Sequence, residues 1–165
     1  DGLRYCQQED IDVLAISDIQ EQFSEALPLV LEIAATNCLV LLEMSADTAT
    51  RVIEKILNCY AATKIESGRM ILADVLEGII VQKLLAKNGG GMALAAEALV
   101  GTAAIKSVIR EGKLKQIETI IQTSGDQGMI SLTQALVNLV RAGEVTQADA
   151  LAVAPRKDDF KIIIK

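Results

Sequence analysis

Short apolar runs alternate with amphipathic stretches in the first sixty residues of this 165-residue chain. Residues 11–17 (IDVLAIS) and 38–44 (CLVLLEM) are almost entirely apolar, as expected for buried strands of a parallel sheet. Residues 24–36 carry apolar side chains at helical spacing, and so does the stretch from Val52 to Tyr60. The order strand, helix, strand, helix predicts a βαβ unit, with parallel strands joined by a right-handed crossover.

A different pattern begins at residue 64. Residues 64–82 have apolar side chains at helical period and predict one long helix. The sequence NGGG at residues 88–91 is a strong turn signal, which predicts a β-hairpin with arms at 83–86 and 92–100. After Gly101 the chain predicts mainly helices.

Capping residues mark the boundaries of these C-terminal helices. Four helices are expected, over residues 102–111, 114–123, 131–142 and 146–154. Gly112 and Gly143 are expected to end the first and the third, and Pro155 to end the last. Thr146 and Asp149 have the spacing of a capping box at the start of the fourth helix.

Together these elements predict an α/β fold, in which a partial parallel sheet of βαβ type precedes a β-hairpin and a helical C-terminal region. The expected domains are residues 1–101, with the hairpin at 83–100, and a helical subdomain at 102–155. A charged tail at 156–165 follows and ends in a strand-like run at residues 162–164.

Composition excludes several classes of function. The chain contains no histidine, which excludes Ser–His–Asp triads, Cys–His nucleophiles and His-ligated zinc. Its aromatic residues are Tyr5, Phe23, Tyr60 and Phe160, too few for a base-stacking platform. The net charge of −6 also argues against a surface that coats DNA. We therefore expect no nucleic-acid partner and no bound metal.

Charge is unevenly distributed along the chain. Residues 1–66 carry twelve acids and four bases, a net charge of −8, whereas residues 67–165 carry ten acids and twelve bases, a net charge of +2. An acidic front and a mildly basic back favour head-to-tail self-association. The alternative is chance clustering on solvated faces.

The cysteines and the N-terminal residues indicate the compartment. Cys6, Cys38 and Cys59 are odd in number and include no CxxC pair, as expected for thiols in a reducing compartment. Residues 1–12 are polar and do not resemble a signal peptide, and the apolar stretch at 27–44 is interrupted by proline and polar residues. These features predict a cytoplasmic protein.

Two motifs in the second half occur at fixed spacing with almost no gaps. They are AAIKSVIREGK at residues 103–113 and the ladder QIETIIQTSGDQGMISLTQALVNLVRAGEVTQADALA at 116–152. The first resembles the AIRNLIRE-type motif, and the second the helical ladder, of the type IV pilus retraction ATPases, the PilT-type twitching-motility motors. Residues 76–102 are similar to the segment where these ATPases run from a helix into a β-hairpin.

The resemblance extends towards the N-terminus. EDIDVLAISDI at residues 9–19 resembles the Walker B region of the family, and LVLLEMSADTATRVIEKIL at 39–57 resembles the frame of its His box. Asp18 then falls on the Walker B glutamate and Ser45 on the His-box histidine. The resemblance implies a RecA-like fold for residues 1–101, ATP and Mg²⁺ as family cofactors, a catalytic role for Asp18 and a nucleotide-binding role for Ser45.

Several positions depart from the family pattern. Asp18 is one methylene shorter than glutamate, Gln20 stands in place of the following arginine, and Ser45 replaces histidine. The sequence contains no GxxxxGK[ST] phosphate loop, which in the family lies upstream of the Walker B strand, and residues 88–92 lack its lysine. We therefore expect that this chain alone holds no cofactor and does not hydrolyse ATP.

Each candidate residue also has a purely structural interpretation. Asp18 would steer Mg²⁺ or activate water in a Walker B role, or cap the segment that follows it. Ser45 would sense the γ-phosphate, or it or Asp47 would cap the next helix. The AIRNLIRE-like motif would contact the pilus machinery, or simply form a helix end. Its residues are Ala104, Ile105, Lys106, Ser107, Val108, Ile109, Arg110 and Glu111.

Three functions compete on these observations. The first is a subunit or fragment of a motor that couples ATP hydrolysis to pilus disassembly. The second is a degenerate, non-catalytic relative that acts as an interaction or regulatory module. The third, an unrelated soluble α/β binding protein, is disfavoured by the ladder at 103–152. The resemblance further implies a homo-oligomeric ring, a hexamer in the family, and a location beside the pilus machinery at the inner membrane.

Overall fold

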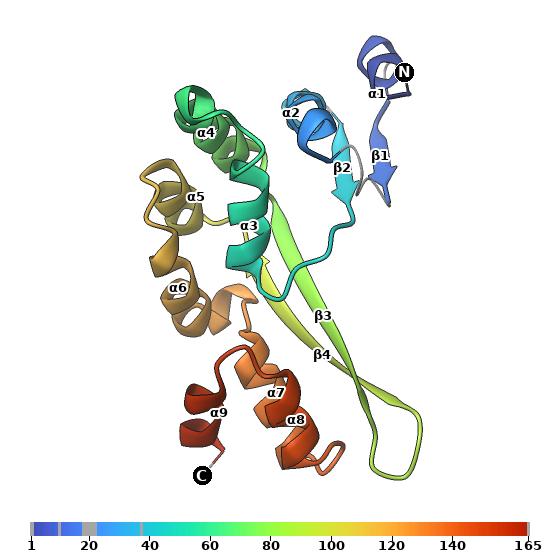
Figure 1. The fold of residues 1–165 in the computed structure, drawn as a ribbon, viewed down its shortest axis with the longest axis vertical. Coiled ribbons are helices and arrows are strands. Elements are labelled where there is room, and N and C mark those ends of the chain that lie inside the picture. The colour runs from blue at the N-terminus through green and yellow to red at the C-terminus, as the bar shows by residue number, and fades with distance from the viewer. Residues whose placement is uncertain (1, 10, 18–22, 37, 165) are drawn as a thin grey trace. The chain divides into compact units, whose positions relative to one another are not determined.

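The computed structural model describes residues 2–9, 11–17, 23–36 and 38–164 (Figure 1). These residues form two compact units that interleave along the chain, and each is described here by itself. The first unit comprises Asp1–Ala46, Thr50–Glu77 and Gly101–Lys115. The second unit comprises Asp47–Ala49, Gly78–Val100 and Gln116–Lys165.

The first unit begins with the predicted βαβ arrangement. After helix α1 (Gly2–Gln8), strand β1 (Val13–Ile16), helix α2 (Phe23–Ala34) and strand β2 (Leu39–Leu42) follow in order. The two strands pair in parallel, with Val13 opposite Leu39 at one end of the register. The prediction of a parallel pair is therefore confirmed, because the connecting helix lets the second strand run in the same direction.

Both strands are less buried than the sequence predicts. The side chains of Val13, Leu39 and Leu41 are 54%, 50% and 55% exposed. Helix α2 packs against β2 and buries its own residues Leu27 and Val30. Exposure alternates along both strands. The expectation of burial on both faces is wrong for the described residues, since a two-stranded sheet with one helical cover leaves a face open.

Helices α3 (Ala49–Leu57), α4 (Ile65–Val75) and α5 (Ala103–Arg110) complete the first unit, except that Ala49 itself belongs to the second. A 3₁₀ turn, η1 (Ala62–Lys64), precedes α4. Helix α4 packs against both α2 and α5. The core of the unit is aliphatic, as the scarcity of aromatic residues requires.

The second unit contains the β-hairpin. Strand β3 (Gly78–Ala86) pairs antiparallel with β4 (Met92–Val100). The turn lies at the predicted NGGG sequence, where all three glycines have positive φ angles that other residues rarely adopt. The predicted helix over 64–82 is wrong in its second half, because α4 ends at Val75 and β3 begins three residues later.

The apolar residues after Val75 fit both the helical and the strand period, and pairing with β4 selects the strand. Ile79 and Val81 are buried while Ile80 is exposed, the alternation of a half-buried strand. Gly101 also permits a close approach at the base of the hairpin, where a Cβ atom would lie 2.0 Å from the carbonyl oxygen of Leu76. The first arm is thus five residues longer than the sequence predicts.

The C-terminal helices match the capping signals closely. They are η2 (Leu114–Gln116), α6 (Ile117–Thr123), η3 (Gly125–Gln127), α7 (Leu132–Arg141), α8 (Gln147–Val153) and α9 (Lys157–Ile163). The Thr146 hydroxyl accepts the amide of Asp149 at 3.1 Å, which confirms the start of α8. Gly112 and Gly143 adopt φ angles of 70° and 71° after their helices, which confirms both ends.

The core of the second unit lies between the hairpin and its helices. Helix α7 packs against β4, α8 packs against β3, and α9 packs against α7 and α8. Phe160 of α9 is fully buried in this core with Leu132 and Leu136 of α7. The predicted strand-like end is therefore wrong, because residues 157–163 form a helix that buries an aromatic anchor. None of the described helices is long and apolar enough to cross a membrane.

Candidate functional site

Asp18, the candidate Walker B residue, lies outside the described residues. The strand that leads to it, β1, is formed and ends at Ile16. The catalytic and the capping interpretations of Asp18 therefore both remain predictions.

Ser45 lies in the irregular segment between β2 and α3, and its side chain is exposed. Its carbonyl oxygen accepts a hydrogen bond from Lys55 Nζ of α3. Helix α3 begins four residues later, at Ala49, so Ser45 does not occupy its N-cap position. The nucleotide-sensing interpretation of Ser45 stays a prediction.

The AIRNLIRE-like motif forms helix α5 and the residue after it. Thr102 caps the helix, because its side-chain hydroxyl accepts a hydrogen bond from the backbone amide of Ile105. Ile105, Val108 and Ile109 are buried, and α5 packs against α4 through this face. These three candidates have a structural role in the first unit.

The other face of α5 carries charged and polar residues that meet Asp74 of α4 and Glu77, which follows α4. Arg110 Nη2 lies 2.6 Å from Asp74 Oδ1. Lys106 Nζ donates to the carbonyl oxygen of Asp74 at 3.3 Å and lies 3.7 Å from Glu77. The Arg110–Asp74 pair is largely solvated, with side chains 38% and 61% exposed, so it stabilises the fold by only about 0–1 kcal/mol. Arg110 is therefore exposed enough to meet another molecule, whereas the Lys106 side chain is only 22% exposed.

Glu111 ends this polar face. Lys113 lies 2.6 Å from its carboxylate, and the Ser107 hydroxyl donates to it at 3.0 Å. These two hydrogen bonds, with the positive charge of Lys113, lower the pKa of Glu111. Glu111 is consequently ionised at neutral pH, and the motif ends in an exposed arrangement of opposite charges.

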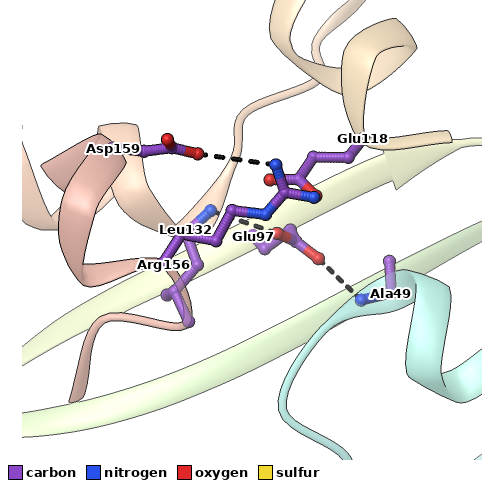
Figure 2. A network of polar contacts seen from close by, with 6 residues as sticks. All are labelled: Ala49, Glu97, Glu118, Leu132, Arg156 and Asp159. Carbon is purple, nitrogen blue, oxygen red and sulfur yellow. Dashed lines mark hydrogen bonds and ion pairs between the residues drawn. The ribbon is translucent and has the colours of Figure 1, made fainter. Parts of the chain in front are cut away.

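Glu97, the buried acid of the hairpin, is not among the residues predicted from the sequence. The Glu97 residue is only 5% exposed. One of its carboxylate oxygens accepts a hydrogen bond of 2.6 Å from the backbone amide of Ala49, and the other accepts one of 3.2 Å from the backbone amide of Leu132 (Figure 2). A sequence signal exists, because Ala93, Ala95, Glu97 and Leu99 share the inward face of β4. A charge at such a position requires buried partners.

A second polar group lies close by in the same unit. Arg156 forms an ion pair with Glu118, and Asp159 lies 3.5 Å from Arg156 on the other side (Figure 2). Burial raises the pKa of Glu118, and the positive charge of Arg156 opposes this effect. The group ties the start of α9 to α6.

The described residues do not fit a complete nucleotide or metal site. They contain no group of three or more acidic or cysteine side chains that could hold a metal ion. The glycine-rich sequence forms the hairpin turn, where the Asn88 side chain donates to the carbonyl oxygen of Gly143 at 2.9 Å. This turn offers no lysine with a following serine or threonine for phosphate binding.

Comparison with known proteins places the chain in a family context. No protein-family model matches it. It is 31% identical over 160 residues to the type IV pilus retraction ATPase PilT of Pseudomonas aeruginosa, covering 97% of this chain and 46% of that protein. It is 30% identical over 155 residues to the type IV pilus ATPase PilU of the same bacterium, covering 93% of this chain and 40% of PilU.

A solved structure gives the same result for the fold. The pilus retraction motor PilT with bound ADP superposes with a TM-score of 0.85 at 32% identity, covering 98% of this chain and 45% of the PilT chain. The chain spans less than half the length of the relatives it matches. Sequence and fold together show that this chain resembles the C-terminal portion of the PilT-type ATPases.

Proposed function

We propose that this chain is part of an ATP-driven motor that retracts type IV pili. The observation that carries the proposal is the agreement over nearly the whole chain, at 31% sequence identity and a TM-score of 0.85. The alternative of a degenerate regulatory module is not better supported by these comparisons.

Nucleotide binding belongs to this proposal through the relatives. The PilT structure contains ADP, which supports ADP and ATP as ligands of the motor to which this chain would belong. Asp18 and Ser45 are our candidates for the residues that this chain contributes, with Mg²⁺ as the expected counterion. The described residues supply no cradle for the phosphates, and they account for no step of hydrolysis by themselves.

The exposed face of α5 is the proposed contact with the pilus machinery. Ile105, Val108 and Ile109 are engaged within the first unit, which leaves the polar residues for an outside partner. Lys106, Arg110 and Glu111 present both signs of charge within two helical turns. Such mixed charge suits a specific protein partner better than a uniformly charged polymer.

Location and assembly follow as parts of the same proposal. We place the protein in the cytoplasm, beside the inner-membrane pilus machinery, and expect it to form a homo-oligomeric ring. The domain division at residues 101 and 102 also remains a proposal, in which residues 102–155 form the helical subdomain.

The proposal is tested in the organism that encodes this chain. Deleting the gene is expected to stop pilus retraction, measured by time-lapse imaging of surface motility, and the wild-type gene is expected to restore it. Arg110→Ala should fail to restore retraction at normal protein levels, because it removes an exposed charge of α5. Lys64→Ala, which removes an exposed charge before α4, is the matched control and should restore retraction. Normal retraction after deletion would overturn the proposal.

A further inference from the structure

The buried carboxylate of Glu97 accepts hydrogen bonds from the first residues of two helices. Ala49 is the first residue of α3 and Leu132 is the first residue of α7, and Glu97 accepts the backbone amides of both. Helix starts have unpaired amides and partial positive charge, so a carboxylate is well suited to this place. The two amides are 83 positions apart in the chain, and the only group that joins them in Figure 2 is Glu97.

We propose that Glu97 is a positioning residue that couples the segment following β2 to helix α7. The two amides share one rigid carboxylate, so a change in the hydrogen bond of Ala49 changes the hydrogen bond of Leu132. This coupling goes beyond the proposed function, which assigns no role to Glu97.

The segment that ends at Ala49 is held by further side chains. Lys83 of β3 forms an ion pair of 2.7 Å with Asp47, two residues before Ala49. Asp47 and Ala49 therefore both attach to the hairpin, the first through β3 and the second through β4. Within the second unit, residues 47–49 are therefore fixed to both strands of the hairpin.

Helix α7 has a second cap, which makes the role of Glu97 distinguishable from simple capping. The Ser131 hydroxyl accepts the amide of Gln134 at 3.2 Å, so α7 starts correctly without help from Glu97. Glu97 thus adds a connection to an already capped helix. We expect removal of the Glu97 carboxylate to abolish the coupling between the Ala49 and Leu132 amides, while both helices still form.

The test uses three variants of this chain and two-dimensional amide NMR without nucleotide. Ala49→Pro removes one donor at a first helical position, where proline is favoured. Glu97→Gln keeps the shape of the side chain but replaces one acceptor with a donor. The control is Glu144→Gln, at a surface acid that pairs with Lys87 in the same unit. The readouts are the chemical shift and the hydrogen-exchange rate of the Leu132 amide.

In the wild-type background, Ala49→Pro is expected to move the Leu132 resonance and to change its exchange rate about tenfold, the effect of altering one buried hydrogen bond. In the Glu97→Gln background, Ala49→Pro is expected to leave Leu132 unchanged. No response of Leu132 to Ala49→Pro would overturn the proposal, as would a response that persists without Glu97 or one that Glu144→Gln reproduces.

If Ala49→Pro fails to fold, Lys83→Met replaces it, because this variant removes the ion pair between Lys83 and Asp47 and leaves the Ala49 amide in place. The response of the Leu132 amide to Lys83→Met is then compared between the wild-type and the Glu97→Gln backgrounds, and a response of equal size in both would overturn the proposal. Since no nucleotide is present, a negative result would leave the proposed function standing.

Discussion

At the scale of single residues, Arg156 shows how a small ionic group connects elements. It lies between Glu118 of α6 and Asp159 of α9, all within the second unit. The Glu118 side chain is 27% exposed, and burial is the main reason that its pKa is raised. Arg156 compensates only part of the cost of burying this charge.

The raised pKa of Glu118 gives a prediction with a definite sign. The unfolded chain has the lower pKa, so this group favours the folded state below that value, and the contribution is lost as pH rises through the folded pKa. We expect Glu118→Gln to reduce this loss of stability as the pH rises above the ordinary glutamate pKa and through the raised pKa of Glu118. Urea unfolding at several pH values measures it. The control is Glu66→Gln, at an exposed acid of α4, and an identical pH profile for both variants would contradict the prediction.

At the scale of elements, the base of the hairpin depends on a close backbone contact. Gly101 follows β4, and its amide donates to the carbonyl oxygen of Glu77 at 2.8 Å, next to the carbonyl of Leu76. A methyl group at residue 101 has no space, because the obstructing atom belongs to the backbone and not to a flexible side chain.

We predict that Gly101→Ala destabilises the protein by about 1–3 kcal/mol, the usual cost of overpacking a tight site. Denaturant unfolding followed by circular dichroism measures this change. Gly125→Ala is the matched control, because a Cβ atom there would meet nothing within 4 Å, and it should change stability by less than about 0.5 kcal/mol. Equal effects of the two substitutions would show that the close contact is not decisive.

At the scale of the whole molecule, the sequence and the charge distribution bear on catalysis and on assembly. The AIRNLIRE-like motif forms helix α5, whereas the described residues contain no glycine-rich loop with a lysine for binding phosphates. The acidic front of the chain and its basic back carry net charges of −8 and +2. These two features lead to one prediction about activity and one about self-association.

The chain alone is expected not to hydrolyse ATP. The sequence contains no phosphate-loop lysine, and Ser45, our candidate for the His-box position, has no ring nitrogen; each lost transition-state contact typically costs about 2–4 kcal/mol. A phosphate-release assay on the purified chain with Mg²⁺ measures this, with a full-length PilT-type ATPase as the positive control. Turnover at the rate of that control would refute the prediction.

Self-association through unlike faces is expected to weaken as salt rises. Electrostatic steering decays once the Debye length falls below about 8 Å, and an apolar surface must supply most of the affinity. Ile80, Leu84 and Met92 are exposed on one face of the hairpin and are our candidates for this surface. Sedimentation velocity at several salt concentrations measures the association. A monomer at high protein concentration and low salt would contradict the prediction, and an oligomer indifferent to salt would contradict its electrostatic part.

Local signals in the sequence determined much of this structure. The capping residue Thr146, the helix-ending glycines and the NGGG turn act within a few positions of the chain, so the elements they define form as predicted. The family assignment likewise rests on motifs that can be read directly from the sequence.

Tertiary structure decided the features in which distant residues compete or combine. Residues 78–82 satisfy both helical and strand patterns, and pairing with β4 selects the strand. Phe160 lies in a short segment of mixed charge, and only the core formed by α7 makes its helix favourable. Glu97 acquires its two partners from positions 48 residues before it and 35 residues after it, a relation that no local pattern contains. The sequence alone determines elements whose stabilising contacts are local, whereas long-range packing settles every place where the local preference is divided or a buried charge needs a partner.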